Sequence, residues 1–168
     1  VYKRQLAPQL VKAGAELLFI QGTIISAEHV QQGGEPLNLK EFIGTLDVPV
    51  IAGGVFDYST AMHLMRSGAA GVIVGSGQSN QSMSLDVPLA TAIADVAAAR
   101  RDYLDETGGR YVHVIANAPV DTSGLIAVAL GVGADAVMLG EPLARASEAS
   151  GGGAVSYTHL TLPTTPYV

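Results

Sequence analysis

The stretch HVIANAPVDTSGLIAVALGVGADAVMLG, residues 113–140, decides the fold of this chain. It begins inside an apolar run at 111–117 whose valines and isoleucine are β-branched, which predicts a strand. The letters DTS then offer an N-cap for a helix over 121–134, and Gly133 ends that helix. A second apolar run follows at 135–140. The stretch therefore predicts a strand-helix-strand unit.

The same pattern occurs earlier, because residues 50–75 align with residues 114–140 as an internal repeat. Four residues recur 64 positions later and four recur 65 positions later: Val50, Ile51, Ala52 and Asp57, then Gly68, Ala69, Val72 and Gly75. Strands that alternate with helices become buried only when neighbouring units form a parallel sheet covered by helices. A repeat of two strand-helix units fits a (β/α)8 barrel, in which ligands bind where strands lead into helices.

Apolar runs and glycine or proline boundaries predict the remaining elements. Strands are expected at 17–22, 48–53, 71–75, 111–117 and 135–140, and helices at 7–14, 37–46, 59–68, 88–107, 121–134 and from Pro142. Five strands in 168 residues fall short of the eight strands and about 250 residues of a complete barrel. The predicted fold class is therefore α/β, as a partial (β/α)8 TIM barrel with parallel strands.

The two ends of the chain differ in composition from its middle. Residues 1–5 are interpreted as a non-native leader. Residues 156–168 are interpreted as an unstructured tail, because they are rich in Thr and Pro and follow three glycines at 151–153. Both ends are similar to adapter-derived sequence, and a natural flexible tail is the alternative. The partial-barrel domain is expected to span residues 6–155.

Composition excludes several classes of function. The net charge is −6 and the nine basic residues are scattered, which argues against a nucleic-acid partner. The chain has no cysteine, and therefore no disulfide, thiolate nucleophile or cysteine-ligated metal. No apolar run reaches the roughly 18 residues of a membrane span, and no signal peptide is visible, so no membrane partner and a cytoplasmic location are expected.

Each predicted strand ends in glycine or leads into other small residues. These ends are Gln21-Gly22-Thr23, Gly53-Gly54, Gly75-Ser76-Gly77, Asn117-Ala118 and Gly140-Glu141. Small residues let a ligand approach the backbone, and the helix that follows offers N–H groups to an anion. Phosphate binding after the last two strands is common in barrels. The alternative is that these glycines only permit tight turns.

Other polar groups give weaker signals. The polar loop 76–86 carries no Lys, Arg or His, and the four histidines have no metal-ligand spacing, so we expect no catalytic residue and no metal. His63 is expected on the outer face of its helix, and His29 in a polar connection. Asp102, Asp105 and Glu106 follow two arginines on the longest helix and predict a solvated face paired within that helix.

The middle of the chain resembles the IMP dehydrogenase/GMP reductase family, and most closely its IMP dehydrogenase-related branch that lacks the catalytic cysteine. The resemblance covers nearly all of Leu6 to Gly153 and includes two specific stretches, LMRSGAAGVIVG and AAARRDYLDETGGRYVHVIA. It implies that the five strands are the fourth to eighth of a barrel. It also implies purine nucleotide metabolism, IMP or GMP as the nucleotide, NAD or NADP as the cofactor, and a homo-oligomer at full length.

Transfer of the family's site to this chain shows three departures. The family's nucleophilic cysteine belongs to the loop that begins at Gly75, which has no cysteine here, so a covalent thioimidate has no nucleophile in this chain. The phosphate-binding Asp-Gly-Gly of the family falls on Asn117-Ala118-Pro119. The serine after the eighth strand falls on Glu141, whose charge would repel a phosphate.

The resemblance implies two groups of site residues. The cofactor-binding candidates are Gln21, Gly22, Thr23, Gly75, Ser76 and Gly77, and the phosphate-binding candidates are Asn117, Ala118, Gly140 and Glu141. The expected function is that of a fragment of an IMP dehydrogenase/GMP reductase-like oxidoreductase, inactive as it stands. One alternative is a non-catalytic nucleotide-binding or regulatory relative. Another is a phosphate-binding barrel of a flavin or sugar-phosphate enzyme. A half barrel exposes two strand edges and an apolar face, so we expect the isolated chain to self-associate.

Overall fold

The computed structural model describes residues 2–22, 28–29, 37–75, 87–117 and 122–149. The chain divides into two compact units, residues 1–138 and 139–168. In the first unit the elements are α1 (Tyr2–Lys12), β1 (Leu18–Gln21), β2 (Glu28–His29), β3 (Leu37–Asn38), α2 (Leu39–Gly44), β4 (Val50–Val55), α3 (Tyr58–Arg66), β5 (Gly71–Val74), α4 (Leu89–Thr107), β6 (His113–Ala116), α5 (Ser123–Gly131) and β7 (Ala136–Val137). The second unit contains α6 (Glu141–Ala144).

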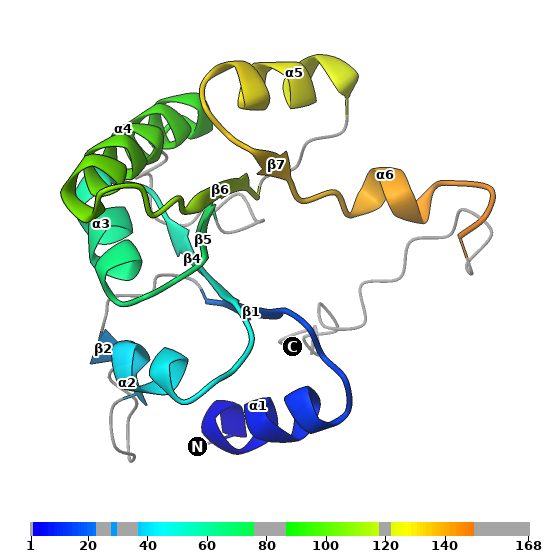
Figure 1. The fold of residues 1–168 in the computed structure, drawn as a ribbon. Coiled ribbons are helices and arrows are strands. Elements are labelled where there is room, and N and C mark those ends of the chain that lie inside the picture. The colour runs from blue at the N-terminus through cyan, green and yellow to red at the C-terminus, as the bar shows by residue number, and fades with distance from the viewer. Residues whose placement is uncertain (1, 23–27, 30–36, 76–86, 118–121, 150–168) are drawn as a thin grey trace, which may run out of the picture. The chain divides into compact units, whose positions relative to one another are not determined.

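The first unit is built on a five-stranded sheet whose order is β1-β4-β5-β6-β7 (Figure 1). Every neighbouring pair in this sheet is parallel. The spatial order of the strands follows their order along the chain, as in a (β/α)8 barrel, whereas a doubly wound sheet reverses its order at a switch point. The sheet therefore confirms the predicted α/β class and forms part of such a barrel.

The internal repeat is preserved in the register of the sheet. Ala52 of β4 pairs with Val72 of β5, and their counterparts Ala116 of β6 and Val137 of β7 pair in the same way. The repeat therefore consists of two strand-helix units with equivalent pairing, as the sequence predicted.

The helices cover one face of the sheet. Alternate strand residues, among them Val72 and Val114, join a large apolar core to which all five helices α1 to α5 contribute buried side chains. On the opposite face, Ile51, Ile73 and Ile115 form a smaller cluster with Met138, to which none of the described helices contributes. The side chains on this second face, called here the inner face, correspond to the interior of a barrel.

The ends of the helices follow from local sequence. The Asp57 carboxylate accepts a hydrogen bond from Thr60 N over 2.8 Å at the start of α3. The Thr122 hydroxyl accepts one from Leu125 N over 3.3 Å, which confirms the N-cap predicted for α5 within DTS. Helix α4 ends at Gly108, whose left-handed conformation stops the helix. No helix among the described residues is long and apolar enough to cross a membrane.

A short hairpin was missed by the sequence interpretation. Strands β2 and β3 pair antiparallel, Glu28 with Asn38 and His29 with Leu37. A polar connection was expected at β2, and the first residues of the helix 37–46 were expected at β3. Strands of two residues show no alternation of apolar and polar side chains, so sequence periodicity does not detect them. The pair forms a separate two-stranded sheet, and the main sheet remains entirely parallel.

Asp102 and Glu106 of α4 pair with a neighbouring helix, so the prediction of pairing within α4 was wrong for these two residues. Glu106 accepts a hydrogen bond from Arg66 of α3 over 2.6 Å. Asp102 accepts one from the hydroxyl group of Tyr58, which precedes Arg66 on α3, over 2.7 Å. Helices α3 and α4 pack side by side, and this brings their polar edges into contact. His63 is exposed on α3, as expected.

Candidate functional site at the carboxyl ends of the strands

Backbone hydrogen bonds join the carboxyl ends of four neighbouring strands. Gly22 N donates to Gly53 O over 2.8 Å, and Gly54 N donates to Gly22 O over 3.0 Å. Gly75 N donates to Val55 O over 3.0 Å, and Asn117 N donates to Val74 O over 2.7 Å. We refer to Gly22, Gly53, Gly54, Gly75 and Asn117 as the rim. The sequence predicted that these strand ends would gather at one edge of the sheet, and in the first unit they do.

Two glycines of the rim are required by the packing of the strands themselves. Gly75 has a φ of +95°, and a Cβ atom there would collide with the carbonyl oxygen of Asn117. A Cβ atom on Gly53 would lie 2.5 Å from the Cβ of Ile73. These glycines are needed whether or not a ligand binds, so backbone packing alone explains why both positions are glycine.

Asn117 differs from the glycines because its side chain is polar and buried. The residue is 8% exposed, and its Nδ2 atom has no hydrogen-bond partner among the described residues. A buried amide without a partner costs free energy, about 1–3 kcal/mol in mutational data. It is therefore a donor suited to an oxygen atom that the described residues do not supply.

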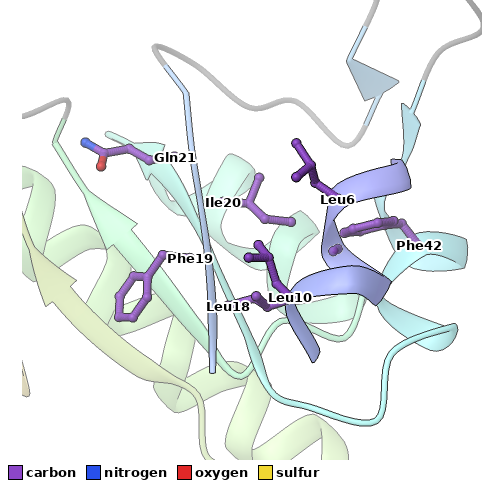
Figure 2. Close-up of a pocket in the computed structure, with 8 residues that line it drawn as sticks. Leu6, Leu10, Leu18, Phe19, Ile20, Gln21 and Phe42 are labelled. Carbon is purple, nitrogen blue, oxygen red and sulfur yellow. The ribbon is translucent and has the colours of Figure 1, made fainter. Parts of the chain in front are cut away.

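Gln21 is the polar side chain at the end of β1. Figure 2 shows it on the same side of the strand as Phe19, whereas Leu18 and Ile20 point toward α1. Gln21 is exposed, and its amide offers both donor and acceptor atoms on the inner face. It could hydrogen-bond the carboxamide or a ribose hydroxyl of a nicotinamide cofactor.

Six predicted site residues lie outside the described residues or in the second unit. Thr23, Ser76, Gly77 and Ala118 lie outside the described residues. Gly140 and Glu141 belong to the second unit. There the carbonyl oxygen of Gly140 accepts hydrogen bonds from Leu143 N and Ala144 N of α6. Of the ten predicted site residues, Gln21, Gly22, Gly75 and Asn117 are placed together at the ends of the strands.

Sequence reasoning did not include Gly54 among the site residues. Its N–H group joins β4 to Gly22, which makes it part of the rim. The signal available was the glycine pair at the end of that strand. The rim itself contains no Lys or Arg, and the N–H groups of Gly22, Gly54, Gly75 and Asn117 already donate to backbone carbonyls. The side-chain amide of Asn117 is therefore the donor that the rim offers to an anion. Among the described residues, no three His, Asp or Glu side chains come together as metal ligands would.

A charged cluster lies at the other end of the strands and was not predicted. Arg100 of α4 donates from Nη1 to Asp135 over 2.6 Å and to the Tyr111 hydroxyl over 2.9 Å. The Asp135 carboxylate also accepts a hydrogen bond from the Tyr111 hydroxyl over 2.6 Å and one from Val114 N over 2.8 Å. Tyr111 lies two residues before β6, and Asp135 directly precedes β7. Both are at the end of a barrel where residues serve stability.

The titration of this cluster reflects competing causes. Partial burial alone raises the pKa of Asp135, but the hydrogen bonds from Tyr111 and Val114 and the charge of Arg100 outweigh it and leave the pKa below its ordinary value of 3.8. The hydrogen bond to Asp135, helped by burial, raises the pKa of Tyr111 above its ordinary value of 10.0. The carboxylate form of Asp135 is thus the form that the fold stabilises.

Comparison with known proteins agrees with this geometry. Residues 2–159 match the family model of the IMP dehydrogenase / GMP reductase domain. An uncharacterized oxidoreductase of Mycobacterium leprae is 59% identical over 167 residues, covering 94% of this chain and 44% of that protein. Inosine-5'-monophosphate dehydrogenase of Haemophilus influenzae is 35% identical over 147 residues, covering 84% of this chain and 28% of that protein.

A solved structure gives the same result for the fold. The crystal structure of an IMP dehydrogenase/GMP reductase-like protein from Corynebacterium glutamicum superposes with a TM-score of 0.80 and 64% sequence identity, covering 89% of this chain and 40% of that one. The chain thus spans less than half the length of the relatives that it matches. With a family model that covers most of the sequence and a barrel-type sheet that ends in a glycine-lined rim, this chain belongs to the IMP dehydrogenase/GMP reductase family.

Proposed function

We propose that this chain supplies the nucleotide-binding strand ends of an oxidoreductase of purine nucleotide metabolism, with IMP or GMP as the nucleotide. The observation that carries the proposal is the Nδ2 atom of Asn117, which is buried at the end of β6 beside the glycines of the rim and has no partner in the described part of the chain. An oxygen atom of a bound nucleotide would satisfy that amide. The family of the chain and the names of its relatives support the same class of ligand.

The proposal assigns no covalent step to this chain. The 168 residues contain no cysteine, so a thiolate for attack on the purine is not available from any of them. The chain by itself is therefore expected to bind a nucleotide without turning it over. A second candidate function, that of a non-catalytic nucleotide-binding relative, is favoured by this same absence.

For a nicotinamide cofactor, NAD or NADP, the described residues provide a partial fit. Gln21 offers an amide for neutral polar groups of the cofactor, and hydride transfer is the chemistry that such a cofactor supplies when bound. The rim provides no cation for the cofactor's phosphates. We propose that Gln21 and Gly22 face the nicotinamide side, that the complete protein acts in the cytoplasm, and that it is a homo-oligomer.

Ligand binding by the 168-residue chain tests the first part. Isothermal titration calorimetry with IMP, GMP, inosine, guanosine and inorganic phosphate separates recognition of the base from recognition of the phosphate. Binding of a nucleotide more tightly than its nucleoside supports the proposal. Equal, undetectable binding of all five compounds would show that the rim is not a nucleotide site.

Turnover requires a complete barrel, and the 64% identical Corynebacterium glutamicum protein offers a frame for one. We would replace its matching segment with this chain and measure NAD(P)H absorbance at 340 nm in the presence of IMP or GMP, with the unaltered protein as the control. Nucleotide binding without turnover in the chimera supports the non-catalytic candidate. Turnover in the chimera supports the oxidoreductase and places the essential nucleophile outside this chain.

A further inference from the structure

The backbone N–H groups of the rim are already used within the sheet. Those of Gly22, Gly54, Gly75 and Asn117 donate to carbonyl oxygens of neighbouring strands over 2.7–3.0 Å. Each of these bonds joins two strands of this chain, so further strands of a barrel would leave them in place. An anion at the rim would therefore have to compete with the sheet for these N–H groups.

The helices that follow β4 and β6 are capped by side chains of this chain. At the start of α3, the Asp95 carboxylate of α4 accepts a hydrogen bond from Tyr58 N over 2.8 Å. The Asp57 carboxylate accepts another from Thr60 N over 2.8 Å. The start of α5 is capped by the neutral hydroxyl group of Thr122. Two carboxylates thus offset the positive end of the α3 dipole, which makes this helix start unsuited to an anion.

The sequence connections that follow the rim strands are acidic. They span residues 22–36, 56–57, 75–88 and 117–122, and they contain five acidic residues and no Lys or Arg. Helix α4 has no side-chain cap at Pro88, but Asp86 precedes that residue by two positions. A phosphate group carries up to two negative charges near neutral pH, so the charge of these connections repels it.

The polar side chains at the described strand ends on the inner face are neutral amides. Asn117 follows Ile115 by two residues, so strand alternation places it on this face, where its Nδ2 atom is buried without a partner among the described residues. Gln21 is exposed at the end of β1 (Figure 2). Between these strands the inner face is apolar and includes Ile73 and Met138. Amides beside apolar surface suit a flat ring that carries uncharged hydrogen-bonding groups.

We propose that the rim binds the uncharged part of the nucleotide, the purine base with its ribose, and makes no contact with the phosphate. This inference rests on the proposed function, because it assigns one part of the same nucleotide to the rim. The Asn117 amide donates to an oxygen or ring nitrogen of that uncharged part, and the phosphate projects away from the rim. The chain should therefore bind a nucleoside about as tightly as the corresponding nucleotide.

Calorimetric titration of the 168-residue chain with IMP and inosine, and with GMP and guanosine as a second pair, measures this preference. Within each pair the dissociation constants should agree within about threefold, because one hydrogen bond to a charged phosphate would contribute about ten- to a hundredfold. The titrations are repeated from about 20 mM to about 300 mM salt. Binding of inosine should not change, and binding of IMP should stay constant or tighten, since salt screens repulsion by a chain of net charge −6.

A substitution at the rim identifies which part of the nucleotide the amide contacts. Asn117→Leu should raise the dissociation constants of IMP and inosine by the same factor, roughly three- to tenfold. Gln9→Leu is the matched control, because it removes an exposed amide from α1 outside the rim. It should leave both constants unchanged. Circular dichroism spectra should show that both variants remain folded.

The possible failures are distinguishable. If IMP binds at least about tenfold more tightly than inosine and this advantage falls as salt rises, the chain contacts the phosphate. That result would overturn this inference and leave the proposed function standing. A loss of affinity in Asn117→Leu that is confined to IMP would also overturn the inference, since it would place the amide at the phosphate. If neither the nucleotides nor the nucleosides bind, the proposed function fails and this inference fails with it.

Discussion

The Arg100 guanidinium donates to the Asp135 carboxylate over 2.6 Å and joins the middle of α4 to the residue that precedes β7. The side chains of Arg100 and Asp135 are only 15% and 25% exposed. Arg100 also lies over the Tyr111 ring, 5.1 Å from its centroid. One carboxylate therefore holds together a helix, the start of β6 and the start of β7.

Removal of this charge should weaken the fold. Asp135→Asn leaves the partly buried guanidinium without its counter-ion, and we expect a loss of roughly 2–3 kcal/mol in the free energy of unfolding. Urea unfolding followed by circular dichroism measures it. Asp105→Asn on the exposed side of α4 is the control, and it should change the free energy by no more than about 0.5 kcal/mol. Equal effects of the two variants would contradict the assigned role of Asp135.

The same carboxylate should make stability depend on pH in acid. The pKa of Asp135 in the folded chain lies below its ordinary value of 3.8. Its stabilising contribution is therefore complete above the unfolded pKa and is lost as the pH falls through the folded pKa. The difference in unfolding free energy between the native chain and Asp135→Asn should shrink as the pH falls from 6 to about 2. A difference that stays constant over this range would show that the carboxylate form is not preferred by the fold.

Gly75→Ala tests whether the rim requires a glycine at the end of β5. Its φ of +95° disfavours a side chain, and the new Cβ would meet the carbonyl oxygen of Asn117. We expect a loss of roughly 3 kcal/mol from strain and collision together. Gly108→Ala is the matched control, since Gly108 has a φ of +68° but open space around it. It should cost about 1 kcal/mol, as measured by thermal unfolding.

Asn117 should show a conflict between stability and binding. Asn117→Leu removes the unpartnered buried amide, so the free protein should be as stable as the native chain or more stable by up to about 1 kcal/mol. The same variant should lose the rise in melting temperature that IMP or GMP produces. Asn117→Asp buries a carboxylate instead and should be destabilised by at least about 2 kcal/mol. A nucleotide-dependent rise that persists in Asn117→Leu would exclude the amide from the site.

The sheet was predictable because it depends on patterns spread over many residues. The repeat of Val50, Ile51 and Ala52 as Val114, Ile115 and Ala116 marks equivalent strands, and glycines mark the helix ends that precede the next strands. Parallel strands that alternate with helices follow from that pattern alone. The resemblance to the family added the expectation of which strands these are.

The interactions between elements were not predictable in the same way. The pairing of Arg66 with Glu106 and of Arg100 with Asp135 joins residues 40 and 35 positions apart, with no periodic signal. Whether an asparagine at the end of a strand finds a hydrogen-bond partner depends on the packing around it, so the buried amide of Asn117 could not be predicted from the sequence. The hairpin of β2 and β3 is too short to have a pattern.

The equivalent register of the two repeats has a consequence for how this chain could be shortened. Excision of residues 69–133 would join Gly68 to Ala134 and bring Val137 to the place that Val72 occupies beside Ala52. Val137 would then replace Val72 at the same register position of the sheet. Two consecutive strand-helix units thus form one module of this molecule. Removing or adding such a module would change the number of strands in the sheet and keep their register.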